Sequence, residues 1–357
     1  MDFKVGLRPC ATITGFRCNM RRLPVYLLID CSESMAGPAI DAVNVAVANM
    51  VRDLLKQPHA LETVAISLIA FAGRARQVVP LIALDLFKVP PLSVSPGTSL
   101  GRALDLLTSC IETEVVKTTR DRKGDWRPLV FLFTDGQPTD DWHSAVKRLK
   151  SLNSPRIANI YAIGCGEDTD FSVLTEITDI VFKVKDMDAE PIRKAFVWIT
   201  ASVQNASTGV AAGMTELPAL SADYDEALKI VTKEECVPLK EPHQVFIHAR
   251  CSKTKGVYLM RYLRKSVQER YTAVAAHKLE GGNMDAYQSP PAVHSAQLNG
   301  VPECPYCGNS SAAVFGFCHG VMCFNQEQSD SPVCPHCGSR QEGGFVTGDF
   351  DVRQSAG

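Results

Sequence analysis

The chain has 357 residues, of which 45% are hydrophobic, and its mean hydropathy is −0.01. A chain of this length can bury more than one core, and two domains are the ordinary expectation at about 100–200 residues each. The 37 basic and 39 acidic side chains leave a net charge of −2, which excludes a general attraction to nucleic acid or anionic membranes. No run reaches the roughly 18 apolar residues of a spanning helix, and the amino terminus lacks the apolar core of a signal peptide. We therefore expect a cytoplasmic protein with no membrane span.

Residues 1–22 show no clear periodic element and are interpreted as an N-terminal extension. Met20 directly precedes the segment "RRLPVYLLID", at which a strand pattern begins. Residues 1–19 are therefore either an extension or a mis-assigned start.

From residue 23 to residue 205, short β-rich runs alternate with amphipathic stretches. The expected strands are Val25–Ile29, Thr63–Phe71, Gln77–Leu84, Leu129–Thr134, Ile157–Ile163 and Ile180–Val184. The first expected helix begins at Pro38. The others cover roughly Ser99–Glu114, Asp141–Leu152, Phe171–Thr178 and Ala189–Val203. The short link "AGRAR" indicates that the second and third strands form an antiparallel hairpin at a sheet edge. This alternation predicts a doubly wound α/β domain with a mostly parallel sheet and one antiparallel edge strand.

The remainder of the chain divides by composition. Residues 206–223 are small, polar and without periodicity, so they are interpreted as a linker, with an ordinary surface loop as the alternative. Residues 224–300 are expected to form a small β unit with a turn at Lys255 and Gly256. A cysteine-rich, zinc-ribbon-like module follows at 301–345, and residues 346–357 form a tail.

Oxygen-bearing side chains follow the expected strands. Asp30 ends the first strand, and Ser32 and Ser34 occupy the turn behind it; Asp135 ends the fourth strand, and Thr98 lies in a Pro-Gly turn before a helix. In open α/β sheets the functional crevice lies beyond the carboxyl ends of the strands, so these five side chains are expected to converge there. Two carboxylates and three hydroxyls suit Mg²⁺ or Mn²⁺, which prefer about six oxygen ligands. Singly, each residue could instead cap a helix, which is the role expected for Asp140 and Asp141.

This combination of Asp30, Ser32, Ser34, Thr98 and Asp135 resembles the metal-ion-dependent adhesion site of von Willebrand factor A (vWA) domains, over residues 23 to about 205. The chain is also similar to the TerY-like bacterial proteins of tellurium-resistance clusters, which carry a cysteine-rich C-terminal metal-binding domain. The resemblance implies a vWA fold and a stress-response system that includes a protein kinase and a PP2C-type phosphatase as partners.

Six cysteines lie between residues 304 and 337. "CPYCG" and "CPHCG" are two similar turns, and Cys304, Cys307, Cys334 and Cys337 are predicted to hold one structural zinc. Between these turns lie Cys318, His319 and Cys323. Cys318 and Cys323 could form a second zinc site, which His319 or His336 would complete. Otherwise the middle cysteines belong to the core. Disulfides are the alternative for the outer four, disfavoured in a reducing cytoplasm.

Three classes of function are compatible with these motifs. The first is a non-enzymatic interaction module, in which the metal accepts a partner's Asp or Glu at an open coordination position. The second is a phosphoryl-transfer or hydrolytic enzyme, but no histidine, lysine or P-loop accompanies the motifs, and Arg102 is the one nearby cation. The third is nucleic-acid binding, suggested by the basic and aromatic residues of "RCSKTKGVYLMRYLRKSVQERY". The first class is preferred: we expect a protein that is not an enzyme and does not take nucleic acid as its partner.

Overall fold

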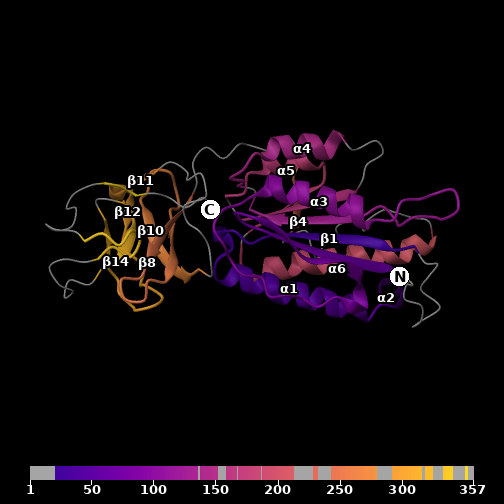
Figure 1. The fold of residues 1–357 in the computed structure, drawn as a ribbon, viewed down its shortest axis with the longest axis horizontal. Helices are drawn as coiled ribbons and strands as arrows, with labels where there is room; N and C mark the ends of the chain where they lie inside the picture. Colours follow the sequence, from indigo (N-terminus) through magenta and orange to yellow (C-terminus); the bar gives the residue numbers. More distant parts are fainter. Residues whose placement is uncertain are drawn as a thin grey trace, which may run out of the picture.

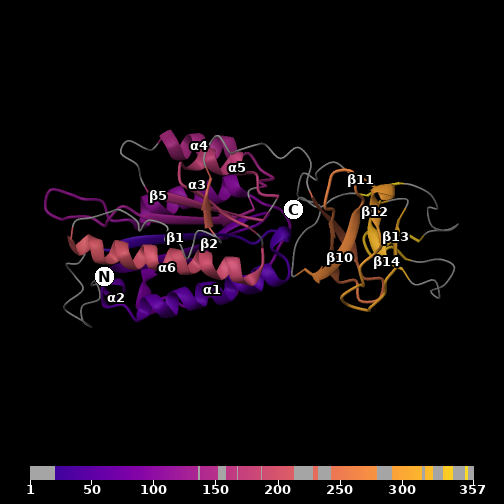
Figure 2. The same ribbon diagram turned by 180° about the vertical axis from the view of Figure 1, so that it is seen from behind.

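The structure is a computed structural model that describes residues 21–352, apart from 136, 152–157, 167, 186, 213–227, 232–242, 280–291, 316–317, 325–332 and 341–349. Two parts are distinguished below: an N-terminal domain of residues 21–231 and a C-terminal module of residues 243–352. Figures 1 and 2 show the C-terminal module against one end of the N-terminal domain. Among the described residues, no helix has the length and apolar character needed to cross a membrane.

The N-terminal domain contains a seven-stranded sheet with the order β3-β2-β1-β4-β5-β6-β7. Its strands are β1 (Leu23–Asp30), β2 (Val64–Phe71), β3 (Ala75–Ala83), β4 (Leu129–Thr134), β5 (Asn159–Cys165), β6 (Val181–Val184) and β7 (Leu228–Ile230). The five inner strands are parallel, whereas the edge strands β3 and β7 run antiparallel to their neighbours. The predicted doubly wound, mostly parallel sheet is confirmed, and β7 adds a second antiparallel edge.

Helices cover both faces of this sheet and form three layers with it. One face is covered by α1 (Pro38–Leu55), α2 (Pro58–Thr63) and α6 (Ala189–Ala212), and the other by α3 (Leu100–Glu114), α4 (Trp142–Ser151) and α5 (Phe171–Ile177) (Figure 1). Alternate residues of β1 enter different cores: Leu27 packs on the α1 side and Leu28 on the α3 side. A central strand covered on both faces must be apolar throughout, which explains the continuous run of "VYLLI".

The C-terminal module is built from two sheets. The larger has the order β12-β10-β9-β8-β14-β13, and the smaller pairs β11 with β15. The strands are β8 (Gln244–Arg250), β9 (Val257–Leu263), β10 (Tyr271–Lys278), β11 (Val293–His294), β12 (Leu298–Asn299), β13 (Ala312–Val314), β14 (Val321–Cys323) and β15 (Asp351–Val352). Because β14 of the cysteine-rich region pairs with β8, the expected β unit and zinc-ribbon-like module form one folded unit. The expected tail contributes β15 to it.

Two boundaries in the structure differ from the division made from sequence. Helix α6 continues to Ala212, into the expected linker, because Ala206 and Ser207 are buried and packing overrides the weak helical propensity of "NASTG". Strand β7, assigned from sequence to the small β unit, pairs with β6 in the N-terminal sheet, where it supplies the edge strand with a hydrogen-bonding partner. Residues 1–20 of the expected extension and 213–223 of the expected linker lie outside the described residues.

Candidate metal centres

The five predicted oxygen ligands lie at the carboxyl ends of β1 and β4 and in the loop before α3. Strands β1 and β4 are neighbours, and their connecting helices lie on opposite faces: α1 follows β1 on one face, and α3 precedes β4 on the other. This is the topological switch point at which open α/β sheets bind their ligands. Asp30 is the last residue of β1 and Asp135 follows β4, so adjacent parallel strands place the two carboxylates at the same edge of the sheet.

Hydrogen bonds hold the residues of the Asp30 loop in place. Asp30 Oδ1 accepts the Ser32 amide at 2.8 Å, and its Oδ2 accepts the Thr134 hydroxyl at 2.6 Å. The hydroxyl oxygens of Ser32 and Ser34 lie 2.9 Å apart, and Ser34 also donates a hydrogen bond to Asp135. The convergence expected for these four side chains is thus present in the structure.

The Thr98 loop is fastened to the loop that follows β4. The Thr98 amide donates to Thr139 Oγ1 at 3.0 Å, and the Thr139 amide donates to the Thr98 carbonyl at 2.8 Å. Asp140 accepts the amides of Gly101 and Arg102, each at 2.9 Å, and so caps α3 from the neighbouring loop. The expectation that Asp140 caps the helix after it is therefore wrong, because the carboxylate reaches the free amides of α3 instead.

Asp141 has the capping role expected of it, since its Oδ1 accepts the Ser144 amide in the first turn of α4 at 3.2 Å. The loops before α3 and α4 approach closely at Gly101, where an added Cβ would lie 2.8 Å from the Asp141 carbonyl oxygen. The two capped helices therefore fix the loops that carry Thr98 and Asp135.

Burial is the main electrostatic feature of this site. Asp30, Ser32 and Thr98 are fully buried, and Asp135 is 7% exposed. Burial, reinforced by the negative charge of Asp135, raises the pKa of Asp30 to about 7. Burial likewise raises the pKa of Asp135 to about 6, although hydrogen bonds from Ser34 and the Gln137 amide oppose the shift. A divalent cation would relieve the repulsion between these two carboxylates when both are ionised. The all-oxygen donor set fits Mg²⁺.

Two further acidic residues, for which the sequence analysis gave no role, lie beside these side chains. Glu33 is fully buried between the two serines, accepts the Gly97 amide at 3.3 Å and pairs with His248 of β8. Asp168 lies in the loop after β5 and is 7% exposed, and its charge acts on Asp135. A signal for Asp168 was present, since it follows the next strand along the same sheet edge. Glu33 carried no signal, because it occupies a variable position of the motif.

Apart from Cys323 on β14, the cysteines described in the C-terminal module are carried by turns of one repeated geometry. In each turn the amide of the first residue donates to the carbonyl of the sixth residue. The amide of the fifth residue donates to the carbonyl of the first. The fifth residue has a positive φ, from 55° to 73°. The four turns begin at Cys251, Cys304, Phe315 and Cys334. A thiol at the first or fourth position of such a turn points to the same side, which suits metal ligation.

The turns pair so that the thiols form two groups rather than one. Within each group the thiol sulfurs lie within 4.8 Å of one another: Cys251, Cys304, Cys307 and Cys323 in the first, and Cys318, Cys334 and Cys337 in the second. Tetrahedral zinc with bonds of about 2.3 Å separates its sulfurs by about 3.8 Å, close to the 3.6 Å between Cys307 and Cys323. The first group therefore has the four ligands of a closed structural site.

The predicted pairing of Cys304 and Cys307 with Cys334 and Cys337 differs from this arrangement. The two CxxC turns belong to separate groups because Cys251, on the β8–β9 turn, and Cys323, on β14, lie beside the first of them. Cys251 was missed because it stands alone in the sequence, more than 50 residues before the next thiol, with no CxxC signature.

The second group contains three thiols, with 3.4 Å between the sulfurs of Cys318 and Cys334. The two histidines considered from sequence lie next to these cysteines in the chain, but neither belongs to a ligand group among the described residues. His336 Nε2 lies 2.7 Å from the Val321 carbonyl oxygen, and His319 is the positive-φ residue of its turn. Cys323, expected in a second site, belongs to the first group.

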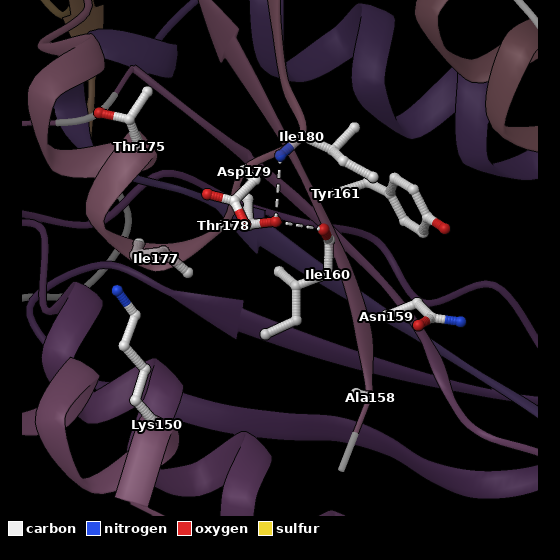
Figure 3. A pocket seen from close by; sticks show the side chains of 10 residues that line it. All are labelled: Lys150, Ala158, Asn159, Ile160, Tyr161, Thr175, Ile177, Thr178, Asp179 and Ile180. Carbon is white, nitrogen blue, oxygen red and sulfur yellow. Dashed lines mark hydrogen bonds between the residues drawn. The ribbon is translucent and has the colours of Figure 1, made fainter. Parts of the chain in front are cut away.

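A pocket of about 310 Å³ lies elsewhere, at the amino ends of β5 and β6 (Figure 3). Lys150, Asn159 and Asp179 line it, and the Thr178 hydroxyl donates to the Ile160 carbonyl at 2.7 Å across its wall. The oxygen ligands lie at the carboxyl ends of the strands, about 20 Å away for strands of this length. The pocket is therefore separate from the metal crevice.

The doubly wound sheet and the oxygen-bearing side chains at its switch point are the features of a vWA domain with a metal-ion-dependent adhesion motif. In agreement, the family model of the von Willebrand factor type A domain matches residues 25–195, and that of the TerY-C metal binding domain matches residues 241–357. The chain therefore contains a vWA domain followed by a TerY-C metal-binding domain, and the resemblance stated from sequence is confirmed.

No curated protein sequence matches the chain. Solved structures match about half of the chain. Proximal thread matrix protein 1 from the mussel byssus is 14% identical with a TM-score of 0.38, covering 52% of this chain and 48% of its own. The pilus adhesin SpaC from Lactobacillus rhamnosus GG is 15% identical with a TM-score of 0.41, covering 52% and 30%. BatB from Bacteroides thetaiotaomicron is 17% identical with a TM-score of 0.36, covering 54% and 100%. This chain thus spans about half or less of the length of the first two of these proteins.

Proposed function

We propose that the protein is a metal-dependent protein-interaction module, in which Mg²⁺ or Mn²⁺ at the vWA site accepts an acidic side chain of a partner. The observation that carries the proposal is the convergence of Asp30, Ser32, Ser34 and Asp135 at the switch point of the sheet, with Thr98 in a loop hydrogen-bonded to the loop after β4. A Mg²⁺ ion keeps several waters as ligands, and one of these can be exchanged for a carboxylate. A crevice with two carboxylates accepts a third only when a cation reverses its charge, so binding should require the metal.

The C-terminal module serves this function as a zinc-stabilised structure. Zn²⁺ at Cys251, Cys304, Cys307 and Cys323 would link the β8–β9 turn to β14 and so fix the sheet of the module. A second ion at Cys318, Cys334 and Cys337 would fasten the outer turns. Zinc supplies folding free energy in modules of this size, whose apolar cores are small.

The resemblance to TerY-like proteins supports a more specific role. On this basis we propose that the chain acts in a bacterial tellurite or stress-response phospho-signalling system, with a Ser/Thr protein kinase and a PP2C-type phosphatase as the partners to test first. We propose the same cytoplasmic compartment for all three, since cysteine thiols that bind zinc must remain reduced.

Two other classes of function have less support. For a metal-dependent hydrolase or phosphotransferase, a general base must reach the metal, yet the groups bonded to Asp30 and Asp135 named above are hydroxyls and backbone amides. For nucleic-acid binding, the aromatic residues of the basic segment should be accessible, but Tyr258 and Tyr262 are 1% and 2% exposed. Buried tyrosines cannot stack on bases.

The proposal is tested by titrating the zinc-loaded chain against a Ser/Thr protein kinase and a PP2C-type phosphatase of the same cell, in Mg²⁺ and in EDTA. Asp135→Ala removes a metal ligand, and Asp105→Ala is the matched control, since Asp105 forms a half-exposed ion pair with Arg148 on the surface of α3 and α4. We expect Mg²⁺-dependent binding by the parent and by Asp105→Ala, with loss in Asp135→Ala. Equal binding by Asp135→Ala, or binding that persists in EDTA, contradicts the proposal.

A further inference from the structure

The face of the C-terminal module that meets the vWA domain is a second apolar face of its sheet. Successive residues of β8 and β9 alternate between two environments. Val245, Ile247 and Met260 pack in the module's own core with the cysteines, whereas Phe246 and Leu259 belong to the large apolar cluster of the vWA domain. Phe246 is 7% exposed and Leu259 is fully buried. The sheet is therefore covered on both faces, and one of the covers is the vWA domain.

The contacts of this face lie on the loops that surround the oxygen site. Glu33, between the two serines of the site, is fully buried and pairs with His248 of β8. Gly37, at the end of the same loop, lies against the ring of His277 on β10: a Cβ added to Gly37 would lie 2.6 Å from His277 Cε1. Gly37 also has a φ of 85°, so both backbone and space favour glycine here.

A third contact lies on the opposite side of the crevice. The backbone amide of His243, just before β8, donates to Asp168 Oδ1 at 3.1 Å. Asp168 belongs to the loop after β5, and its carbonyl accepts the Gln137 side-chain amide at 2.6 Å, which connects it to the loop of Asp135. The module thus touches loops beyond β1 and β5, on both flanks of the strand β4 that Asp135 follows.

From these contacts we propose that the C-terminal module is an intramolecular cover of the vWA metal-site face. The sheet β8-β9-β10 occupies the approach that an external acidic side chain would use, so an external ligand binds only after the module moves from the Asp30 and Asp168 loops. This inference rests on the proposed function for the identity of the ligand, but the cover itself does not depend on it. The first binding partner of the metal-site face is then the module of the same chain.

Hydrogen exchange measured by mass spectrometry on the full, zinc-loaded chain tests the cover without using metal at the vWA site. Phe246→Asp places a charge in the contact, and Val274→Asp is the matched control, since Val274 is 49% exposed on β10. We expect faster exchange in peptides spanning residues 31–37 and 168–170 for Phe246→Asp and no change for Val274→Asp. Burial of one aromatic side chain corresponds to a factor of roughly ten or more in the closed population.

His248→Ala is the second variant, in case Phe246→Asp disturbs the module itself, which loss of zinc in native mass spectra would reveal. It removes the partner of Glu33 without entering the apolar core, and we expect a smaller increase of exchange at residues 31–37. If both variants leave the two loops as slow as in the parent while the module remains zinc-loaded, the cover is wrong.

Access to the site is measured separately, by the rate at which EDTA removes Mn²⁺ from the loaded chain. The cover predicts release about tenfold faster in Phe246→Asp and unchanged in Val274→Asp. Exposed loops with unchanged Mn²⁺ release would show that the module does not control entry, which overturns the proposal. Failure of the parent to bind Mn²⁺ would instead contradict the proposed function, while the exchange experiment would still decide whether the cover exists.

Discussion

The vWA site and the cysteine groups are both candidate metal centres, but they depend on the metal in different ways. The oxygen ligands stand on a sheet with a helical layer and an apolar cluster on each face, and hydrogen bonds already hold their loops. The thiols stand on short turns in a module with a smaller core. We infer that the metal changes the charge of a preformed crevice in the first case and completes the fold in the second.

The largest expected effect comes from removing a ligand of the first cysteine group. Cys304→Ser should lower the zinc content from two ions per chain to one and strongly destabilise the C-terminal module, because metal binding by small zinc modules contributes on the order of 10 kcal/mol to folding. Cys334→Ser should remove the other ion and leave the first. Native mass spectrometry gives the stoichiometry, and Cys110→Ser, a buried thiol on α3 outside both groups, is the control. Loss of the only zinc in both variants would favour the pairing predicted from sequence.

The next effect is on the oxygen site, where a lost ligand should change binding but not folding. Asp30→Asn should weaken Mn²⁺ binding by at least about a hundredfold, the upper range for losing even an indirect contact to a metal. The metal-free variant should be as stable as the parent or more so, since one of two repelling buried carboxylates is gone. Titration calorimetry and thermal melting check the two statements, and a large fall in metal-free stability would sink the idea of a preformed crevice.

A pH series sharpens the same comparison. The folded-state pKa values of Asp30 and Asp135, about 7 and about 6, lie above the unfolded value of about 3.9. The folded state therefore binds more protons between about pH 4 and pH 7, so metal-free stability should increase as the pH falls through this window. Stabilisation by Mg²⁺ should decrease over the same range, because protons compete with the metal. Each pKa unit corresponds to about 1.4 kcal/mol, and Asp135→Asn should flatten both profiles in chemical denaturation.

The smallest effect is expected at the cap of α3. Asp140→Ala leaves the amides of Gly101 and Arg102 without their acceptor, which should cost about 0.5–2 kcal/mol and loosen the loop of Thr98. Asp141→Ala removes the cap of α4 and is the matched control. Urea denaturation should show similar losses of stability, but only Asp140→Ala should also weaken Mn²⁺ binding. Equal metal affinity in the two variants would show that Thr98 is positioned by other contacts.

The two regions also differ in what their sequences predict. Parallel strand order determines which strand ends are neighbours, so Asp30 and Asp135 could be placed together from the hydrophobic pattern and the switch-point rule. Which turns pair in the C-terminal module depends on β8 and β14 lying side by side, a long-range contact with no local signal. The isolated thiol of Cys251 was therefore missed. The contact of Glu33 with His248 was missed for the same reason, since it joins two domains.

Anomalous diffraction tests the central claim most directly, on crystals of the zinc-loaded chain soaked in Mn²⁺ and measured at the manganese and zinc absorption edges. The account predicts one manganese peak among Asp30, Ser32, Ser34, Thr98 and Asp135, and one zinc peak in each cysteine group. A manganese peak elsewhere, or a single zinc bridging Cys304 and Cys307 to Cys334 and Cys337, would contradict it.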